Sequence, residues 1–340
     1  MNSSFSQPPA KYLRSDPDED GASPECIRSK PWFEDGNIVL ETEGVQFKVY
    51  MGILADNSAI FRDLFTIAQA QEGELVDGCP LIHLGDKSQD LAHVLEALHH
   101  SRKWLGDTSG EKEAMPLRVL AAFLKLGRKY EIDHVRQQAV NRLATAFPSD
   151  LDACFESCSR GPRTVIDVDL RKGDLLHLVS IIRENELLVH LPVLLLVCIL
   201  RDHLGTTSIF LLSPDTQQPI LAYADIELCH KAYIQLVQLQ ATEILSWMKW
   251  EAPTCGINSC KAWQQVLRRN YPGSAFVVGS RWQEHVARGL CEKCKLHART
   301  KYREGQEKVH EMLPSLFDLP PWEELREKWS TDETLDLFEM

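Results

Sequence analysis

The chain has 340 residues, of which 44% are hydrophobic and 25% charged, and its formal net charge is −12. This composition is typical of a globular protein and excludes wholesale disorder. An anionic chain also disfavours non-specific binding to nucleic acid or acidic membranes. The longest apolar run, residues 187–200, is shorter than the about 20 residues needed to cross a bilayer. We therefore expect no membrane span and interpret this run as a buried core helix that is broken near Pro192.

The first 30 residues are rich in Ser, Pro and acidic side chains and lack hydrophobic periodicity. We expect residues 1–30 to be a disordered leader. They contain no apolar segment of the kind found in a signal peptide, so we predict an intracellular protein of the cytoplasm or nucleus. In that reducing environment the ten cysteines are expected to be free, buried or metal-bound and not paired as disulfides.

Residues 31–148 alternate between strand and helix patterns. Residues 38–40 form an apolar run typical of a buried strand, Gly44 indicates a turn, and residues 45–49 alternate as a second strand. A third strand is expected at 81–84, and 66–79 and 101–115 are expected to be loops. Helical spacing follows at these positions: 53–55, 59–65 with Ser58 as N-cap, 91–98, 117–126 and 135–147. The fold class is therefore α+β, with too few strands for a doubly wound sheet.

Phe47 is followed along the chain by Leu54, Ala55, Ser58 and Phe61. These residues match a pattern of Phe, Leu–Ala, Ser and Phe in the BTB/POZ domain, which residues 32–148 resemble. With its long loop at 101–115 and its tail at 313–326, the chain also resembles the expanded BTB family of mushroom-forming (basidiomycete) fungi. The sequence of residues 126–130, ending in Lys129–Tyr130, resembles the family's turn between two closing helices. The resemblance implies a small sheet flanked by helices that mediates protein–protein contact.

Two positions depart from the family pattern. The family often has an Asp at the start of the first strand and an Arg or Lys that pairs with it near a dimer interface. Aligned on Phe47, these positions hold Asn37 and Met51. Losing both charges together is physically coherent, because losing one alone leaves a buried, unpaired charge. The substitution weakens the expectation of an interface that depends on this pair.

Beyond residue 148 the chain continues with wide apolar helical faces. Residues 149–252 are expected to form a mostly α-helical extension, similar to the one that follows many BTB domains. Residues 253–312 are predicted to form a basic helical module with paired cysteines. Residues 313–340 form an acidic tail, whose Leu, Phe and Trp side chains are expected to dock back on the protein.

Four cysteines occur as two pairs, Cys255 with Cys260 and Cys291 with Cys294. Two-residue spacing lets one turn direct both thiolates at one ion, and Zn²⁺ prefers four such ligands in a tetrahedron. The sequence therefore predicts a structural zinc site. The alternative is that these cysteines are small buried apolar side chains. His285 and His297 are candidate substitute ligands.

Residues 261–310 carry most of the basic side chains of this part of the chain, interleaved with Trp263, Trp282 and Tyr302. Basic and aromatic residues together can bind nucleic acid, which is the alternative function for residues 255–310. We favour a solvated helix face that pairs with the acidic tail.

The common catalytic sequence motifs are absent from the chain, among them G-x-S-x-G, the P-loop and H-E-x-x-H. We therefore predict a protein that is not an enzyme and has no small-molecule substrate: an adaptor acting through its BTB/POZ domain. In the family, such domains either pair with a second copy or recruit a cullin-type ubiquitin-ligase scaffold. The sequence leaves both kinds of protein partner open.

Overall fold

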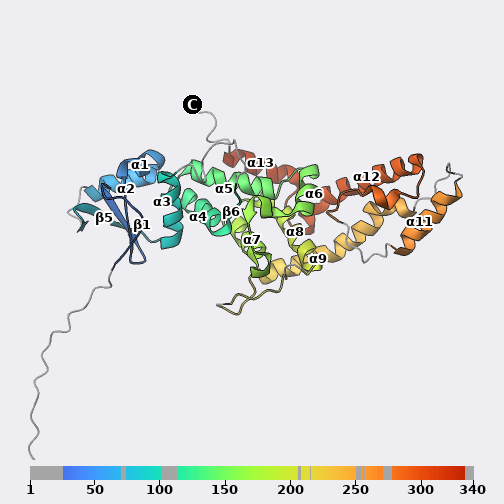
Figure 1. The fold of residues 1–340 in the computed structure, drawn as a ribbon, viewed down its shortest axis with the longest axis horizontal. Helices are drawn as coiled ribbons and strands as arrows, with labels where there is room; N and C mark the ends of the chain where they lie inside the picture. The colour runs from blue at the N-terminus through green and yellow to red at the C-terminus, as the bar shows by residue number, and fades with distance from the viewer. Residues whose placement is uncertain are drawn as a thin grey trace, which may run out of the picture.

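The computed structural model describes residues 26–69, 74–100, 113–205, 208–214, 216–249, 255, 257–270 and 278–333. The molecule is elongated, with a sheet at one end and a helical arm at the other (Figure 1). It is mixed α+β and mostly helical, which confirms the predicted fold class. None of the helices in the described part is long and apolar enough to span a membrane.

The sheet has five strands in the order β1-β3-β2-β5-β4. Its strands are β1 (Ile27–Trp32), β2 (Ile38–Thr42), β3 (Val45–Val49), β4 (Leu75–Val76) and β5 (Cys79–His83). A two-residue turn joins β2 to β3 with positive φ at both Glu43 and Gly44, the geometry that matches strand twist in tight hairpins. β5 runs parallel to β2. The predicted first two strands and their turn are therefore confirmed.

Strand β1 corrects one prediction. Residues 27–30, expected to lie in a disordered leader, are part of a strand that pairs parallel with β3, with an irregularity in register between Arg28 and Trp32. Pro31 lies within this irregularity, and β1 is an edge strand, where the missing N–H of a proline is tolerated. Pairing to β3 supplies the order that the local sequence pattern lacks.

Helices surround this sheet and continue away from it. They are α1 (Met51–Asn57), α2 (Ala59–Gln69), α3 (Ser88–His99), α4 (Leu117–Lys129) and α5 (Asp133–Ala146). As predicted, Ser58 caps α2: its Oγ accepts from the Phe61 N–H at 3.0 Å and donates to the Tyr130 carbonyl at 2.5 Å. The expected loop at 66–79 is wrong in part, because α2 extends to Gln69 and β5 begins at Cys79. Residues 101–112 of the other expected loop lie outside the described residues, and Met115–Pro116 forms the short strand β6.

The core of this N-terminal unit is built from the strands and helices that the sequence pattern predicts. Phe47, Leu54, Phe61, Leu95, Leu120 and Leu124 are at most 1% exposed. Asn37 and Met51, the two aligned departures, lie in contact, because the Asn37 side-chain oxygen accepts from the Met51 N–H at 2.7 Å. An amide therefore caps the start of α1 where the resemblance implies a charged pair.

The buried carboxylate of Asp86 links the segment after β5 to the end of α4. Asp86 follows β5 and is 6% exposed. It accepts from Lys129 Nζ at 2.7 Å and from the Tyr130 hydroxyl. Burial, and the hydrogen bond to this carboxylate, raise the pKa of Tyr130 well above its usual range. The segment 126–130, singled out in the sequence, is therefore fixed to the sheet by a charged hydrogen-bonded group.

The rest of the described chain is mostly helical and includes the two-residue strand β7 (Ile166–Asp167), which pairs with β6. Its helices are α6 (Leu151–Arg160), α7 (Asp174–Glu184), α8 (Leu191–His203), α9 (Tyr223–Leu239), α10 (Ser246–Lys249), α11 (Asn258–Asn270), α12 (Glu292–Leu316) and α13 (Trp322–Glu333). The apolar run at 187–200 is divided just before Pro192, as predicted. Residues Leu188–His190 form a separate 3₁₀ helix, and α8 begins at Leu191 with Pro192 in its first turn, where the missing N–H costs nothing.

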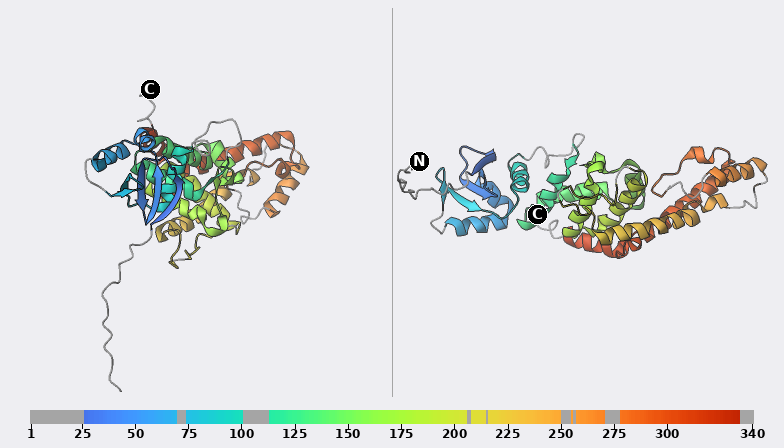
Figure 2. Two further views of the ribbon diagram at one scale, coloured as in Figure 1. Left: turned by 60° about the vertical axis from the view of Figure 1, so that its left-hand side comes forward. Right: turned by 90° about the horizontal axis from the view of Figure 1, so that it is seen from below.

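The acidic tail docks back, as predicted. Trp322 is 6% exposed, its Nε1 donates to the His310 carbonyl at 2.6 Å, and its ring stacks on the His310 ring. Trp329 packs edge-on against the buried His190. Helix α13 thus lies beside the junction between the N-terminal unit and the helical body (Figures 1 and 2).

Candidate metal centre

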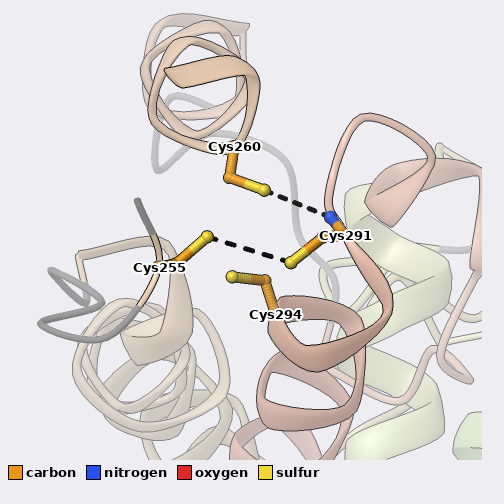
Figure 3. Close-up of side chains that lie close together, drawn as sticks. All are labelled: Cys255, Cys260, Cys291 and Cys294. Carbon is orange, nitrogen blue, oxygen red and sulfur yellow. Dashed lines mark hydrogen bonds between the residues drawn. The ribbon is translucent and has the colours of Figure 1, made fainter. Parts of the chain in front are cut away.

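Three separate segments bring the four paired cysteines together (Figure 3), where α11 meets the start of α12 at the end of the molecule far from the sheet (Figure 1). Cys255 precedes α11, Cys260 lies in its first turn, and Cys291 and Cys294 lie at the start of α12. The four sulfur atoms all lie within 4.8 Å of one another. The spacing prediction therefore identified a real cluster.

The distances in the cluster suit a tetrahedral ion. Cys255 Sγ and Cys291 Sγ are 3.8 Å apart. Four thiolates at about 2.3 Å from a central Zn²⁺ stand about 3.8 Å from one another. Cys255, Cys260 and Cys294 are buried, and Cys291 is half-buried. Such a site is closed to solvent on most sides, as structural zinc sites are.

The electrostatics of the cluster favour at least one thiolate. Cys291 is the N-cap of the 25-residue helix α12, and the backbone N–H of Cys294 donates to its sulfur, which lowers the pKa of Cys291 to about 7. Burial raises the pKa of Cys294 and of Cys260. Without a bound cation the buried thiols therefore keep their protons, and a divalent ion must displace them.

A tryptophan holds the two halves of the cluster in register. Trp263, in α11, donates through Nε1 to the Val286 carbonyl at 2.8 Å. Its ring lies so close to Gly289 that a Cβ at this position would meet it at 2.4 Å. The Arg288 guanidinium lies over the Trp263 ring, 5.2 Å from its centroid. These contacts dock α11 on the turn that leads to Cys291.

Helix α12 connects the cluster to the body through a close helix contact. Gly305 packs against a π-helical turn at Gln240–Ile244, and a Cβ on Gly305 would lie 2.7 Å from the Glu243 carbonyl oxygen. One turn farther from the cluster, Lys308 and Glu243 form an ion pair at 2.7 Å across the same contact. The missing side chain at 305 therefore lets two backbones approach.

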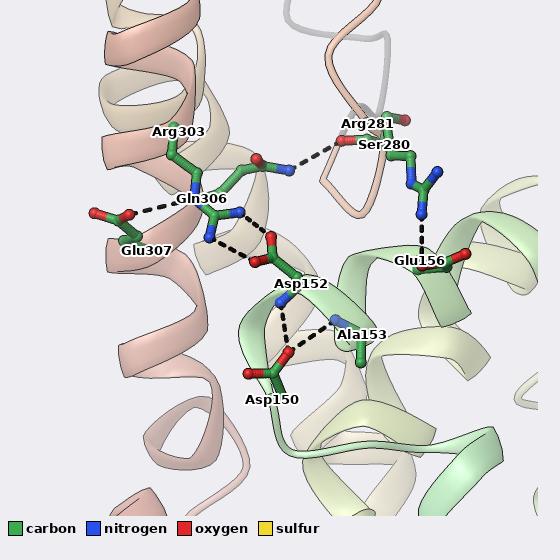
Figure 4. A network of polar contacts seen from close by, with 9 residues as sticks. All are labelled: Asp150, Asp152, Ala153, Glu156, Ser280, Arg281, Arg303, Gln306 and Glu307. Carbon is green, nitrogen blue, oxygen red and sulfur yellow. Dashed lines mark hydrogen bonds and ion pairs between the residues drawn. The ribbon is translucent and has the colours of Figure 1, made fainter.

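A polar network joins the arm to α6 (Figure 4). Arg303 binds the Asp152 carboxylate through both guanidinium nitrogens and also pairs with Glu307 at 3.3 Å. Arg281 pairs with Glu156 at 2.6 Å. Each exposed pair contributes little on its own, but together they fix the direction in which α12 leaves the body.

These ion pairs correct the expected role of the basic residues. Six cations of the module pair with acids of α6, of the π-helical turn or of the module itself, and in the described part of the chain none of these pairs involves the acidic tail. The paired cations are Arg281, Lys295, Arg299, Lys301, Arg303 and Lys308. The structure also does not support the predicted substitute ligands, because neither His285 nor His297 belongs to the cluster.

Comparison with known proteins adds no family or fold relative: no family model, curated protein or solved structure matches the chain.

Proposed function

We propose that this protein is a non-enzymatic adaptor for protein–protein contact, with a BTB/POZ-type unit at one end and an arm held in shape by a structural Zn²⁺ ion. For the metal, the supporting observation is the convergence of four sulfurs within 4.8 Å. An all-thiolate set suits Zn²⁺ and leaves no open position for a substrate, which favours a structural over a catalytic ion.

The charge around the cluster agrees with a bound ion. Four thiolates and one Zn²⁺ carry a net charge of about −2. Cations adjoin the ligands in the sequence: Lys261 follows Cys260, and Lys293 lies between Cys291 and Cys294. A positive surrounding lowers the cost of ionising buried thiols.

For the adaptor role, the supporting observation is the order and packing of elements in residues 26–147. Two antiparallel strands (β2 and β3), the helix pair α1–α2, the parallel strand β5, helix α3 and the helix pair α4–α5 occur in this order along the chain, which agrees with the strands and helices that the BTB/POZ resemblance implies. The contact between Asn37 and Met51 agrees with the alignment that made them equivalent to a paired position of the family.

This unit also exposes an apolar surface on which a partner can bind. Ile60 and Ile67 lie seven residues apart on α2, hence on one face of the helix, and are 38% and 60% exposed. β1 already occupies the edge of β3 within the same chain. A swapped dimer, in which β1 pairs with β3 of a second copy, therefore requires β1 to leave its own β3, whereas a cullin-type scaffold or other protein can bind α2 directly.

Two measurements on the full-length chain test these proposals separately. Elemental analysis of the purified protein is expected to give one zinc per chain. Affinity purification from the protein's own cells is expected to recover a stoichiometric protein partner, or light scattering is expected to show a dimer. Either interaction should be lost in the double variant Ile60→Arg/Ile67→Arg. The matched control is Ile234→Arg on α9. Ile234 is 59% exposed, about as much as Ile67, and this variant should retain the partner. Loss in the control as well, or turnover of a substrate, contradicts the adaptor proposal.

A further inference from the structure

Helix α11 presents a cationic, amide-bearing face to solvent. Asn258, Lys261, Gln265 and Arg269 are all exposed and recur at three- and four-residue spacing, which places them on one side of the helix. The opposite side, with Cys260, Gln264 and Leu267, is buried. Packing of this buried side on the cysteine cluster therefore fixes which side chains point outward.

The arm has a charge opposite to that of the whole chain. Residues 255–310 contain eleven Lys and Arg against four Glu, a net charge of +7 in a chain of −12. Six of these cations are ion-paired, as described above. Lys261, Arg269 and Lys293 form no ion pair with a described carboxylate, and all three are exposed. These three cations are therefore available to bind an anion from outside.

The shape of the molecule separates this charge from the acidic remainder. α11 lies at the end of the long axis opposite to the sheet (Figures 1 and 2). At physiological ionic strength, exposed charges are screened beyond about 8 Å. The net charge of the chain therefore does not decide what the arm attracts.

We propose that the exposed face of α11 binds duplex DNA, with its cations on phosphates and its amide side chains toward base edges in the major groove. This proposal goes beyond the adaptor role and rests on the position of α11, not on the identity of the metal. An α-helix fits the major groove of DNA, whereas the major groove of duplex RNA is too narrow for it.

The side-chain types on this face favour DNA over an acidic protein segment. Lys and Arg neutralise phosphates, and Asn and Gln can form two hydrogen bonds with one adenine. Segment 252–283 contains no Asp or Glu, so no acidic side chain on α11 repels a phosphate backbone. An acidic peptide would bind the cations of this face, but its carboxylates offer no matched pair of hydrogen bonds to the interleaved Asn258 and Gln265.

The test is fluorescence anisotropy of the zinc-loaded full-length protein with a labelled DNA duplex of mixed sequence, across a series of salt concentrations. We expect Lys261→Gln/Arg269→Gln to weaken binding about tenfold at low salt and to reduce the slope of log K against log salt by about 2. The control Lys231→Gln/Lys328→Gln removes the same net charge from α9 and α13 and should leave both quantities unchanged. Asn258→Ala/Gln265→Ala should weaken binding without changing the slope.

Four results overturn the proposal. They are no binding at low salt, an equal loss in the control variant, tighter binding to duplex RNA, and displacement of the DNA by polyglutamate at lower concentration than by unlabelled DNA. Zinc content, measured in each variant, distinguishes loss of DNA contact from loss of the arm's structure.

Discussion

The two ends of this molecule are stabilised in different ways. The N-terminal unit buries large apolar side chains around its sheet, among them Phe47, Phe61 and Phe123, each at most 1% exposed. At the far end, α11 packs on the rest of the protein through its own Trp263 and Leu267 and through the cluster of four cysteine sulfurs. A short helix cannot bury enough apolar surface to hold itself in place, and a metal ion supplies the missing free energy in small modules of this kind. Removing one group should therefore have very different effects at the two ends.

The largest effect is expected from a metal ligand. Cys294→Ser removes a buried sulfur and should abolish zinc binding, a contribution on the order of 10 kcal/mol to the order of the arm, while the N-terminal unit stays folded. Zinc stoichiometry and protease cleavage within 255–300 measure this. Cys158→Ala is the control, because Cys158 is also buried but lies outside the cluster. Loss of zinc in both variants contradicts the assignment of ligands.

The matching change in the N-terminal unit is Asp86→Ala. It leaves the buried Tyr130 hydroxyl and the nearby Lys129 without their acceptor, and should lower the free energy of unfolding by about 3 kcal/mol. Zinc content should not change. The half-buried carboxylate of Asp90 forms a looser pair with the exposed Lys125 at 3.6 Å, so Asp90→Ala should cost less than about 1 kcal/mol in the same denaturant titration. Equal costs for the two variants argue against a special role for Asp86.

The junction between the two ends should be sensitive to acid. Burial lowers the pKa of His190 to about 4, and its Nδ1 lies 3.0 Å from the Phe147 carbonyl oxygen. Between about pH 6.5 and 4 the unfolded chain binds a proton that the folded chain excludes, so stability falls as the pH is lowered, by about 3 kcal/mol at most for this group. His190→Asn should flatten the dependence of Tm on pH in this range. An unchanged slope means that other histidines dominate it.

The smallest expected effect comes from replacing a glycine by alanine at two helical positions, one in a close backbone contact and one open to solvent. Gly305→Ala forces a methyl group against the Glu243 carbonyl oxygen and should cost about 1–3 kcal/mol. Gly52→Ala lies in α1 with no atom within 4 Å of the added Cβ, so it should stabilise the protein by about 0.5–1 kcal/mol. Thermal unfolding of the two variants compares them. A gain in both excludes a tight contact at 305.

The sequence predicted the features that depend on local pattern. The β2–β3 hairpin follows from alternation around Gly44, the α2 cap from Ser58, and the cysteine cluster from two short spacings. β1 was missed because three of its six side chains are exposed and only the pairing with β3, which is not its neighbour in sequence, makes it a strand. The support of the cluster by Trp263 and Gly289 was also missed, because a close approach between distant residues has no local signature. Carboxylate partners of the basic residues, such as Asp152 for Arg303, likewise depend on how helices pack.

Hydrogen–deuterium exchange of the full-length protein, before and after removal of metal by a chelator, tests most directly whether the two ends are stabilised differently. Loss of the ion should increase exchange in residues 257–270 and 284–300 and leave exchange in 38–49 and 117–146 unchanged, and zinc added back should restore the slow exchange. Unchanged exchange in α11 after the metal is removed, or an equal increase at both ends, would contradict the account.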